Sequence, residues 1–368
     1  MAAKKRILRM ASYPTKEESG RGLNCYETSK IDDIKVIYLT WFKKLAQPFE
    51  VPPNVKLYTS SFYTNENPRT KNIITRLLFM IHRLFKLILF SIFGIYLIFK
   101  HRVDIVHIHS PMFGLVAVVG KFFGKQTFIT FHGADFFRVE NAIWYKLIAR
   151  KLDCVFSISP RYIPRLKEIH SCQVLQIYNG IDLDIYKNFN QRRKPQIITV
   201  ANFKKQKALD ILIKGFDKFL KKYPELNNYN LVIVGKGLLF VEIQELISQL
   251  ELMEKVKLVG QKERNSLIQL YNESEVFILP SIWEGFAKVL VEAMSCGCKV
   301  ISTKVDSAPL VLEDWGYMIN HSQPDEICES LKKIIEDENY PFNRQTKSLK
   351  RFTWNFVRDI YSNVVFAK

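Results

Sequence analysis

Short runs of apolar, β-branched residues alternate with amphipathic segments along most of this chain. The runs lie at 5–14, 103–110, 125–133 and 153–159 in the first half, and at 195–203, 230–237, 255–260 and 275–281 in the second half. Continuous apolar runs of this length are typical of strands buried on both faces of a parallel sheet, and parallel strands need a helical crossover between them. The alternation therefore predicts an α/β chain with doubly wound sheets.

The chain is long enough for two domains of ordinary size, because it has 368 residues. A polar segment at 179–195, "NGIDLDIYKNFNQRRKP", separates the two series of predicted strands. Segments of this composition are typical of linkers. We therefore expect one Rossmann-like domain before this segment and one after it, facing each other across a cleft.

The positive charge is concentrated in the first half of the chain. The net charge is +18, and residues 1–185 carry 27 Lys and Arg against 14 Asp and Glu, whereas 186–368 carry 27 against 22. Such an excess indicates an anionic partner, which can be a membrane surface, a phosphorylated lipid or a nucleic acid. A nucleic-acid binder needs basic residues interleaved with exposed aromatic ones. Most aromatic residues here lie in predicted strands and helices, so we expect no nucleic-acid partner.

Residues 73–99 form a long apolar segment whose role the sequence leaves open among three interpretations. Its apolar run, Leu87 to Phe99, has 13 residues when Ser91 and Gly94 are included, fewer than the roughly 20 that span a bilayer. The surrounding region 71–102 has six Lys and Arg and no acidic residue. A basic amphipathic helix in contact with an anionic membrane surface is the interpretation that we favour. A buried helix of the first domain and a membrane-spanning helix are the alternatives.

The cysteines and histidines give no strong metal pattern. The six cysteines contain no CxxC pair, and reduced thiols of a cytoplasmic protein are the expected state. The N-terminal "MAAKKRILRMASYP" lacks the long apolar core of a signal peptide. His107 and His109 alternate along one predicted strand, so a three-histidine site with His132 is one interpretation. Packing and hydrogen bonding at strand ends is the interpretation that we favour, and we expect no metal.

The stretch 280–302, "PSIWEGFAKVLVEAMSCGCKVIS", joins a strand to a helix and holds Glu284 and Glu292 eight positions apart. In such units ligands bind at the carboxyl end of the strand, where the N–H groups that open the helix favour anions. We expect the N–H groups of 285–288 to be unpaired and to bind a pyrophosphate. Glu292 lies about 12 Å further along the helix. It could bind both ribose hydroxyls while Glu284 binds hydroxyls of a sugar.

This stretch is similar to the E-x7-E signature of the retaining family-4 glycosyltransferases, which are named glycosyl transferases group 1 and have the GT-B fold. The other blocks that match this family, in the same order, are "FHGAD" (131–135), "YNGID" (178–182), "ANFKKQKALDILIKGF" (201–216), "LVIVGKG" (231–237) and "VKLVGQKERNSLIQLYNESEVFILPS" (256–281). The resemblance implies an acceptor-binding domain over 1–185 and a donor-binding domain over 186–351. It also implies that the C-terminal helix, 352–368, crosses back to the first domain.

The resemblance also implies the roles of single residues. Lys207 would neutralise the diphosphate leaving group, Glu284 would hold the donor sugar, and His132 would reach toward the transferred sugar. The implied donor-binding residues are Lys204, Lys205, Gly285, Phe286, Ala287, Glu292, Gly260, Gly20 and Gly22.

Some positions depart from the family's pattern. Asn202 replaces an arginine that usually precedes Lys207 by five positions, so Lys204 or Lys205 would supply the second cation. Ala287 stands at a frequent glycine, and "VDSAP" at 305–309 replaces a usual glycine pair.

The resemblance implies transfer of a hexose from a UDP- or GDP-linked sugar to a hydroxyl group, with retention and without a metal or other cofactor. We expect the acceptor to be a membrane-associated glycan or lipid-linked molecule of polysaccharide, lipopolysaccharide or glycolipid synthesis. The expected location is the cytoplasmic face of the cell membrane, as a peripheral protein. A sugar-nucleotide epimerase or hydrolase of the same fold is the first alternative, and a basic nucleic-acid-binding protein the second.

Overall fold

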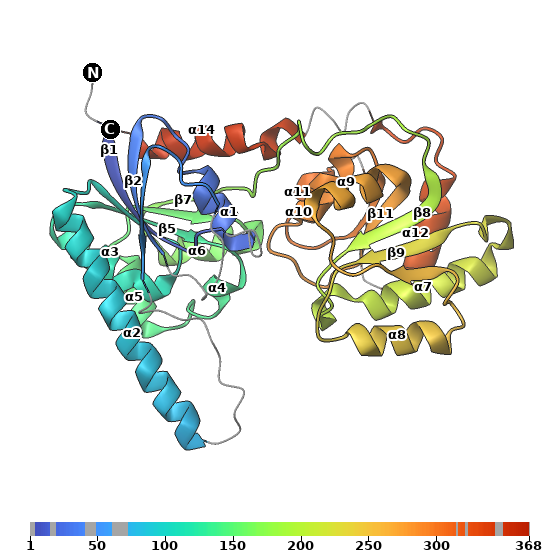
Figure 1. The fold of residues 1–368 in the computed structure, drawn as a ribbon, viewed down its shortest axis with the longest axis horizontal. Coiled ribbons are helices and arrows are strands. Elements are labelled where there is room, and N and C mark those ends of the chain that lie inside the picture. The colour runs from blue at the N-terminus through green and yellow to red at the C-terminus, as the bar shows by residue number, and fades with distance from the viewer. Residues whose placement is uncertain are drawn as a thin grey trace. The chain divides into compact units, whose positions relative to one another are not determined.

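The computed structural model describes residues 4–14, 20–40, 49–60, 73–313, 316–320, 323–342 and 349–367. It divides the chain into two compact units. Unit 1 combines Met1–Tyr178 with Val357–Lys368, and unit 2 is Asn179–Phe356, whereas the sequence predicted the division at 185/186. Each unit has one parallel sheet with helices beside it (Figure 1). The prediction of two Rossmann-like domains is confirmed.

Unit 1 contains a seven-stranded parallel sheet in the order β3-β2-β1-β4-β5-β6-β7. The strands are β1 (Lys5–Met10), β2 (Ile34–Thr40), β3 (Val55–Thr59), β4 (Ile105–Ile108), β5 (Gln126–Phe131), β6 (Cys154–Ser157) and β7 (Gln173–Gln176). The α-helices are α1 (Gly20–Glu27), α2 (Ile73–Lys100), α3 (Gly114–Phe122), α4 (Ala134–Phe137), α5 (Ile143–Ala149), α6 (Ile163–Ile169) and α14 (Trp354–Val365). The strand order changes direction between β1 and β4, which are neighbours in the sheet.

Helix α14 belongs to unit 1 from Val357 onward. The hydroxyl of Tyr361 lies 2.8 Å from Nδ1 of the buried His107, and a guanidinium nitrogen of Arg358 lies 3.1 Å from a carboxylate oxygen of Glu27. Val357 and Tyr361 are almost fully buried. Residues from the end of the chain therefore complete the core of the unit that begins the chain.

Unit 2 contains a six-stranded parallel sheet in the order β10-β9-β8-β11-β12-β13. The strands are β8 (Lys194–Val200), β9 (Asn230–Val234), β10 (Val256–Leu258), β11 (Ser274–Leu279), β12 (Lys299–Thr303) and β13 (Tyr317–Ile319). The α-helices are α7 (Leu209–Lys222), α8 (Phe240–Gln249), α9 (Arg264–Glu273), α10 (Lys288–Ser295), α11 (Ala308–Leu312) and α12 (Pro324–Ile335). The order changes direction between the neighbouring strands β8 and β11. Ligands of such sheets bind at the carboxyl ends of the strands that flank this point.

Helix α2 is buried only in its second half. Its buried residues are Phe90, Ser91, Gly94, Leu97 and Ile98, whereas the first half extends beyond the sheet of unit 1 (Figure 1). The helix has 28 residues, and its most apolar window has a mean hydropathy of 1.9 with 17% of the window buried. Its length and composition would allow it to cross a membrane. The interpretation as a buried helix therefore holds for the second half of α2 only.

Candidate functional site

Two loops of unit 2 meet where the strand order changes direction. The loop after β8 carries Lys207, and the loop after β11 carries Glu284. Because β8 and β11 are neighbouring parallel strands, both loops leave the same edge of the sheet. The backbone also joins them, since the N–H of Ile282 donates to the carbonyl of Gln206 at 2.8 Å.

Lys207 and Glu284 form an ion pair in these loops. Their side chains are 14% and 10% exposed, so the pair is largely shielded from water. The hydroxyl of Ser281 donates to the same carboxylate oxygen of Glu284 at 2.8 Å. Attraction between opposite charges increases as water is excluded. The ion pair thus holds together two residues that lie 77 positions apart. They are the residues that the sequence analysis expects at the diphosphate and at the sugar of the donor.

The loop that carries Glu284 is held by the segment that follows β12. The N–H of Glu284 donates to a carboxylate oxygen of Asp306 at 2.9 Å, and the N–H of Ala287 donates to the hydroxyl of Ser307 at 2.9 Å. Asp306 has a φ of 36°, a left-handed conformation that most side chains disfavour. The "VDSAP" segment, which departs from the family's glycine pair, therefore supports this loop through side chains.

These contacts correct one expectation from the sequence. Four unpaired N–H groups were predicted at 285–288, but that of Ala287 donates to Ser307 and that of Lys288 donates to the carbonyl of Phe286 at 2.9 Å. The N–H of Gly285 has no partner among the described residues. The anion-binding capacity of this backbone is therefore smaller than predicted.

We predict that Ser307→Ala destabilises unit 2 by about 1–3 kcal/mol, because it leaves the buried N–H of Ala287 unpaired. Denaturant unfolding of the full chain, followed by a probe of unit 2, measures this change. Ser307→Thr keeps the hydroxyl and serves as the matched control. Equal stability of the alanine variant and the wild type would contradict a supporting role for Ser307.

Glu292 lies on α10 and is 4% exposed. One of its carboxylate oxygens is 3.0 Å from the ammonium nitrogen of Lys288, and the other accepts a hydrogen bond from the hydroxyl of Tyr271 at 3.3 Å. Burial, together with the charge of Glu292, raises the pKa of Tyr271 well above its usual range. Tyr271 therefore remains a hydroxyl donor. Both oxygens of Glu292 are thus oriented before any ligand is present.

The other predicted residues of unit 2 differ in exposure. Lys204 and Lys205 are exposed, whereas Phe286 and Ala287 are buried. Gly260 follows β10 with a φ of 70°, and its carbonyl accepts from the N–H of Gly235 at 2.9 Å. A side chain on Gly260 would meet no atom within 4 Å. Glycine is therefore favoured there by its conformation and not by lack of space.

The remaining predicted residues, His132, Gly20 and Gly22, belong to unit 1. Gly20 begins α1. Gly22 lies in the same helix, where a side chain would approach the backbone nitrogen of Pro14 to 2.7 Å. The ring of His132 faces His109, with 3.1 Å between His132 Nε2 and His109 Nδ1.

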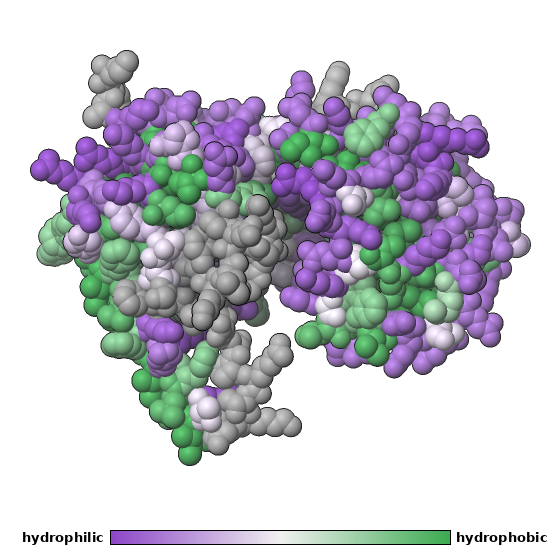
Figure 2. Space-filling view, in the orientation of Figure 1, coloured by the Kyte–Doolittle hydropathy of each residue, from purple (hydrophilic) through white to green (hydrophobic). Residues whose placement is uncertain are grey.

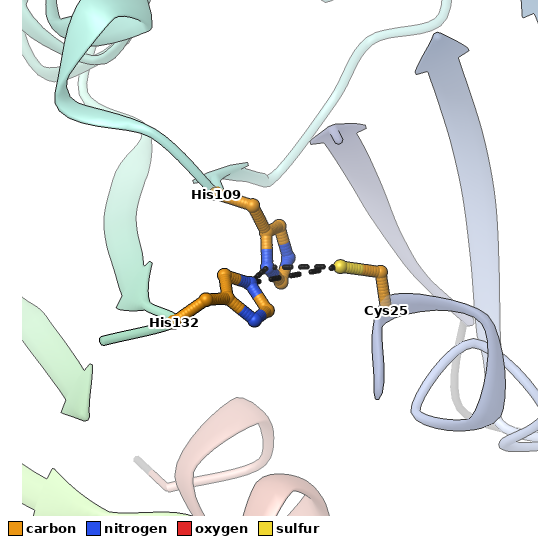
Figure 3. A group of neighbouring side chains, drawn as sticks. All are labelled: Cys25, His109 and His132. Carbon is orange, nitrogen blue, oxygen red and sulfur yellow. Dashed lines mark hydrogen bonds between the residues drawn. The ribbon is translucent and has the colours of Figure 1, made fainter. Parts of the chain in front are cut away.

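Figure 3 shows that Cys25 completes this group, with its sulfur 3.1 Å from His109 Nδ1 and 4.0 Å from His132 Nε2. His107 does not belong to this group, contrary to the three-histidine interpretation. Both ring nitrogens of His107 have other partners, the hydroxyls of Tyr361 and Thr130, each at 2.8 Å. His107 therefore joins α14 to the sheet.

The sequence reasoning missed residues that act through others. Ser281, Asp306 and Ser307 hold the loop of Glu284, and Tyr271 orients Glu292. The signal for Ser281 was its position three residues before Glu284. Asp306 and Ser307 follow β12, the parallel neighbour of β11. Their position at the same edge of the sheet as the loop of Glu284 was the signal that could have identified them.

Two family models match consecutive parts of the chain. "Glycosyltransferase Family 4" matches residues 54–185, and "Glycosyl transferases group 1" matches residues 181–351. The chain is 27% identical to one component of the human phosphatidylinositol N-acetylglucosaminyltransferase over 252 residues, which is 65% of this chain and 51% of that protein. The chain thus spans about half the length of this relative.

A bacterial relative and a solved structure extend these likenesses. The chain is 26% identical over 260 residues to the N-acetylgalactosamine-N,N'-diacetylbacillosaminyl-diphospho-undecaprenol 4-alpha-N-acetylgalactosaminyltransferase of Campylobacter jejuni, covering 64% of this chain and 67% of that one. The solved structure of Anabaena Alr3699/HepE in complex with UDP matches with a TM-score of 0.74 and 16% identity, covering 98% of this chain and 99% of that one. The likeness to this solved structure demonstrates a common fold.

Proposed function

Because this chain belongs to the group 1 glycosyltransferases with a family 4 N-terminal domain, we propose that it transfers a hexose from a nucleotide diphosphate sugar to an acceptor hydroxyl, with retention of configuration. The observation that carries the proposal is the ion pair between Lys207 and Glu284 at the change of strand direction in unit 2. Glu292, on the helix that follows, is already oriented by two partners. Cation, sugar-binding acid and ribose-binding acid are thus present together.

In the proposed reaction the bond between the anomeric carbon and the β-phosphate oxygen breaks. The acceptor oxygen forms its bond to the same face of that carbon, and its proton moves to the departing phosphate oxygen. Negative charge accumulates on the diphosphate as the bond breaks, and a fixed cation stabilises that charge. Lys207 is the cation for this step. It requires no metal ion, because the ammonium group performs the neutralisation.

The ion pair also gives the site a defined resting state. Without substrate, Lys207 neutralises Glu284 and keeps a largely buried carboxylate from being unpaired, which would be costly. A diphosphate would compete with Glu284 for Lys207. Hydroxyl groups of the donor sugar would then take over the carboxylate.

A donor panel tests the proposal. Thermal-shift measurements with UDP-, GDP- and ADP-sugars are expected to single out a UDP- or GDP-sugar, and incubation with an acceptor extract is expected to release the nucleotide diphosphate. NMR of the product would report the anomeric configuration. Absence of stabilisation by every donor would contradict the proposal.

Two alternatives give different results in the same assays. A sugar-nucleotide epimerase or hydrolase consumes the donor equally well without acceptor. A nucleic-acid-binding protein shifts random DNA or RNA on a gel at physiological salt and ignores the donors. The family favours transfer over both.

We further propose that the acceptor is a glycan or lipid-linked molecule at the cytoplasmic face of the cell membrane, and that α2 contacts the anionic surface there. The support is an apolar stripe along α2. Its exposed members are Ile73, Ile74, Leu77, Leu78, Met80, Ile81, Leu84, Phe85, Ile88, Ile92, Tyr96 and Phe99. At about 100° per residue these positions cover a single side of the helix. Figure 2 shows this hydrophobic surface along α2.

The basic residues of α2 lie on the other side of the helix. Arg76, Arg83 and Lys86 fall on the side opposite to the apolar stripe, as do Thr75 and His82. Such a helix suits the plane of a membrane interface, with its apolar side in the lipid and its cations near anionic headgroups. A transverse orientation would put Arg83 and Lys86 inside the hydrocarbon, which is unfavourable. We therefore favour the in-plane orientation.

The apolar surface continues onto the neighbouring helices of unit 1. Phe99 of α2 packs edge-to-face on Phe123 with ring centroids 4.8 Å apart. Phe122 at the end of α3 is 84% exposed, and Ile143 on α5 is 78% exposed. Large exposed apolar patches mark membrane or protein contacts. The proposed membrane surface thus extends from α2 across α3 to α5.

We predict that Leu77→Glu/Leu84→Glu weakens binding to vesicles of anionic lipid at least about tenfold, because two apolar side chains of the stripe each stabilise insertion by about 1.5–3 kcal/mol. Co-sedimentation at low and high salt measures this. Thr75→Glu/His82→Glu adds the same acidic charge on the opposite side and is the matched control. Equal loss in both variants would contradict apolar insertion, and resistance of the wild type to alkaline extraction would contradict the in-plane orientation.

A further inference from the structure

The atoms of Cys25, His109 and His132 converge on one point at the carboxyl edge of the sheet in unit 1 (Figure 3). Cys25 belongs to α1, which follows β1, His109 directly follows β4, and His132 directly follows β5. Strands β1, β4 and β5 are consecutive neighbours in the sheet. The topology therefore brings together three residues that are up to 107 positions apart.

We propose that Cys25, His109 and His132 bind a divalent transition-metal ion, with Zn²⁺ the best fit, and that the bound ion withdraws His132 from sugar transfer. The first part is independent of the proposed function, and the second part rests on it.

The distances suit a common ion. With Zn–S near 2.3 Å and Zn–N near 2.0–2.1 Å, two ligand atoms of a tetrahedral site lie about 3.3–3.6 Å apart. The three ligand atoms here are 3.1, 3.1 and 4.0 Å apart, two distances just below this range and one just above it. Three protein ligands leave a fourth position for water or another ligand. A thiolate with two imidazoles favours zinc or copper over magnesium or calcium.

Hydrogen bonding alone explains this arrangement less well. Nδ1 of His109 lies 3.1 Å from both Cys25 Sγ and His132 Nε2. A ring nitrogen carries either one hydrogen or one lone pair, so it cannot form two good hydrogen bonds at once. The other nitrogen, Nε2 of His109, is buried without a partner among the described residues. The ring is therefore oriented by what its Nδ1 faces.

The surroundings of Cys25 decide how an ion would enter. Burial raises the pKa of the Cys25 thiol to about 12, so the ion must displace its proton. Charged and titratable groups around the thiol come from several adjacent elements: Arg9 on β1, Tyr38 on β2, His109 after β4, His132 after β5 and Tyr361 on α14. The Arg9 cation favours the thiolate. His132 is only half-buried, whereas Cys25 and His109 are buried, so access is from the side of His132.

Occupation of the group would use His132, the residue that the resemblance implies reaches toward the transferred sugar. His132 Nε2 is directed at His109, and a nitrogen that binds an ion has no lone pair or hydrogen for the donor sugar. Metal binding and sugar transfer would therefore exclude each other. The metal is thus an inhibitor in this proposal and not a cofactor of the transfer.

The first experiment measures metal binding on the full wild-type chain. Titration with Co²⁺ is expected to produce a thiolate-to-cobalt charge-transfer band and the visible bands of a tetrahedral site, with one equivalent bound, and Zn²⁺ is expected to displace the cobalt. This readout needs no variant and no activity. Absence of the thiolate band would show a hydrogen-bonded cluster only and overturn the proposal.

The second experiment uses variants. Cys25→Ser is expected to lower the Zn²⁺ affinity at least about 100-fold, since losing even a hydrogen-bond partner behind a metal ligand costs about 10–100-fold. Cys172→Ser removes another thiol of unit 1, which is half-buried, and is the control that keeps the affinity. Equal loss, or no loss, in both variants would overturn the assignment of Cys25.

The third experiment tests the inhibition. Zn²⁺ is expected to lower sugar transfer of the wild type at least tenfold, with recovery on adding EDTA, and to leave the Cys25→Ser variant unaffected. Tight Zn²⁺ binding with unchanged sugar transfer would overturn only the proposal that the ion withdraws His132 from transfer. A chain that binds Zn²⁺ but transfers no sugar from any donor would contradict the proposed function and leave the metal site in place.

Discussion

Replacing Lys207 with alanine is expected to lower the turnover number for sugar transfer by about 100–1,000-fold, which is the usual effect of removing one preorganised group from a developing negative charge. Lys207 is held beside the proposed donor site by Glu284, so its ammonium group would be in place before the bond breaks. The Michaelis constant should change much less, because the charge on the diphosphate grows in the transition state. Steady-state kinetics with the best donor measures both quantities.

Two further variants separate this effect from a loss of structure. Lys214→Ala removes an exposed lysine of the adjacent helix α7 and should leave the kinetics unchanged. Lys207→Arg keeps the cation and should recover part of the turnover. Equal turnover of Lys207→Ala and the wild type would contradict the assignment. So would a fall in the thermal stability of Lys207→Ala that accounts for its whole loss of turnover.

Replacing Glu292 with alanine is expected to weaken nucleotide binding at least about 100-fold. The carboxylate is expected to accept hydrogen bonds from two ribose hydroxyls, and hydrogen bonds to a charged group contribute about 1.5–3 kcal/mol each. A 100-fold loss corresponds to about 2.7 kcal/mol, which lies within the range for one such bond and is therefore the smallest loss expected when both bonds are removed. Isothermal titration with the free nucleoside diphosphate measures the dissociation constant without any acceptor.

The control for Glu292 must separate its charge from its partners. Glu292→Gln keeps the size of the side chain and should show an intermediate loss, while Glu245→Gln removes an exposed carboxylate of α8 and should show none. If Glu292 binds the ribose, the wild type should bind a deoxyribonucleotide more weakly than the ribonucleotide. The Glu292→Ala variant should bind the two nucleotides equally well. Equal nucleotide affinity of Glu292→Ala and the wild type would sink the assignment.

The fold was largely predictable from the sequence because its central strands are buried on both faces. Segments such as 103–110 and 275–281 are rich in apolar and β-branched residues, and β4 and most of β11 lie within them. The strands that were missed, β2, β3, β7 and β13, lie toward or at the sheet edges. In β3 and β7 most residues are partly buried or exposed, so an apolar run is weaker there.

The candidate site was only partly predictable. Glu284, Glu292 and Lys207 follow from family motifs, and the structure brings Lys207 and Glu284 together. The pairing itself depends on which strands are neighbours, which the sequence does not state. The same holds for Cys25, whose contact with His109 arises because β1 and β4 are adjacent. Motifs identify types of residue, whereas topology determines their partners.

The chain connects its two units twice, since residues after Val357 return to unit 1. During synthesis on the ribosome, the sheet of unit 1 emerges long before Tyr361 is available to cover His107. Unit 2 can complete its own core in the meantime. Unit 1 is therefore completed only after unit 2, and a nascent chain that stalls before α14 would leave His107 and Phe156 without their contacts to Tyr361.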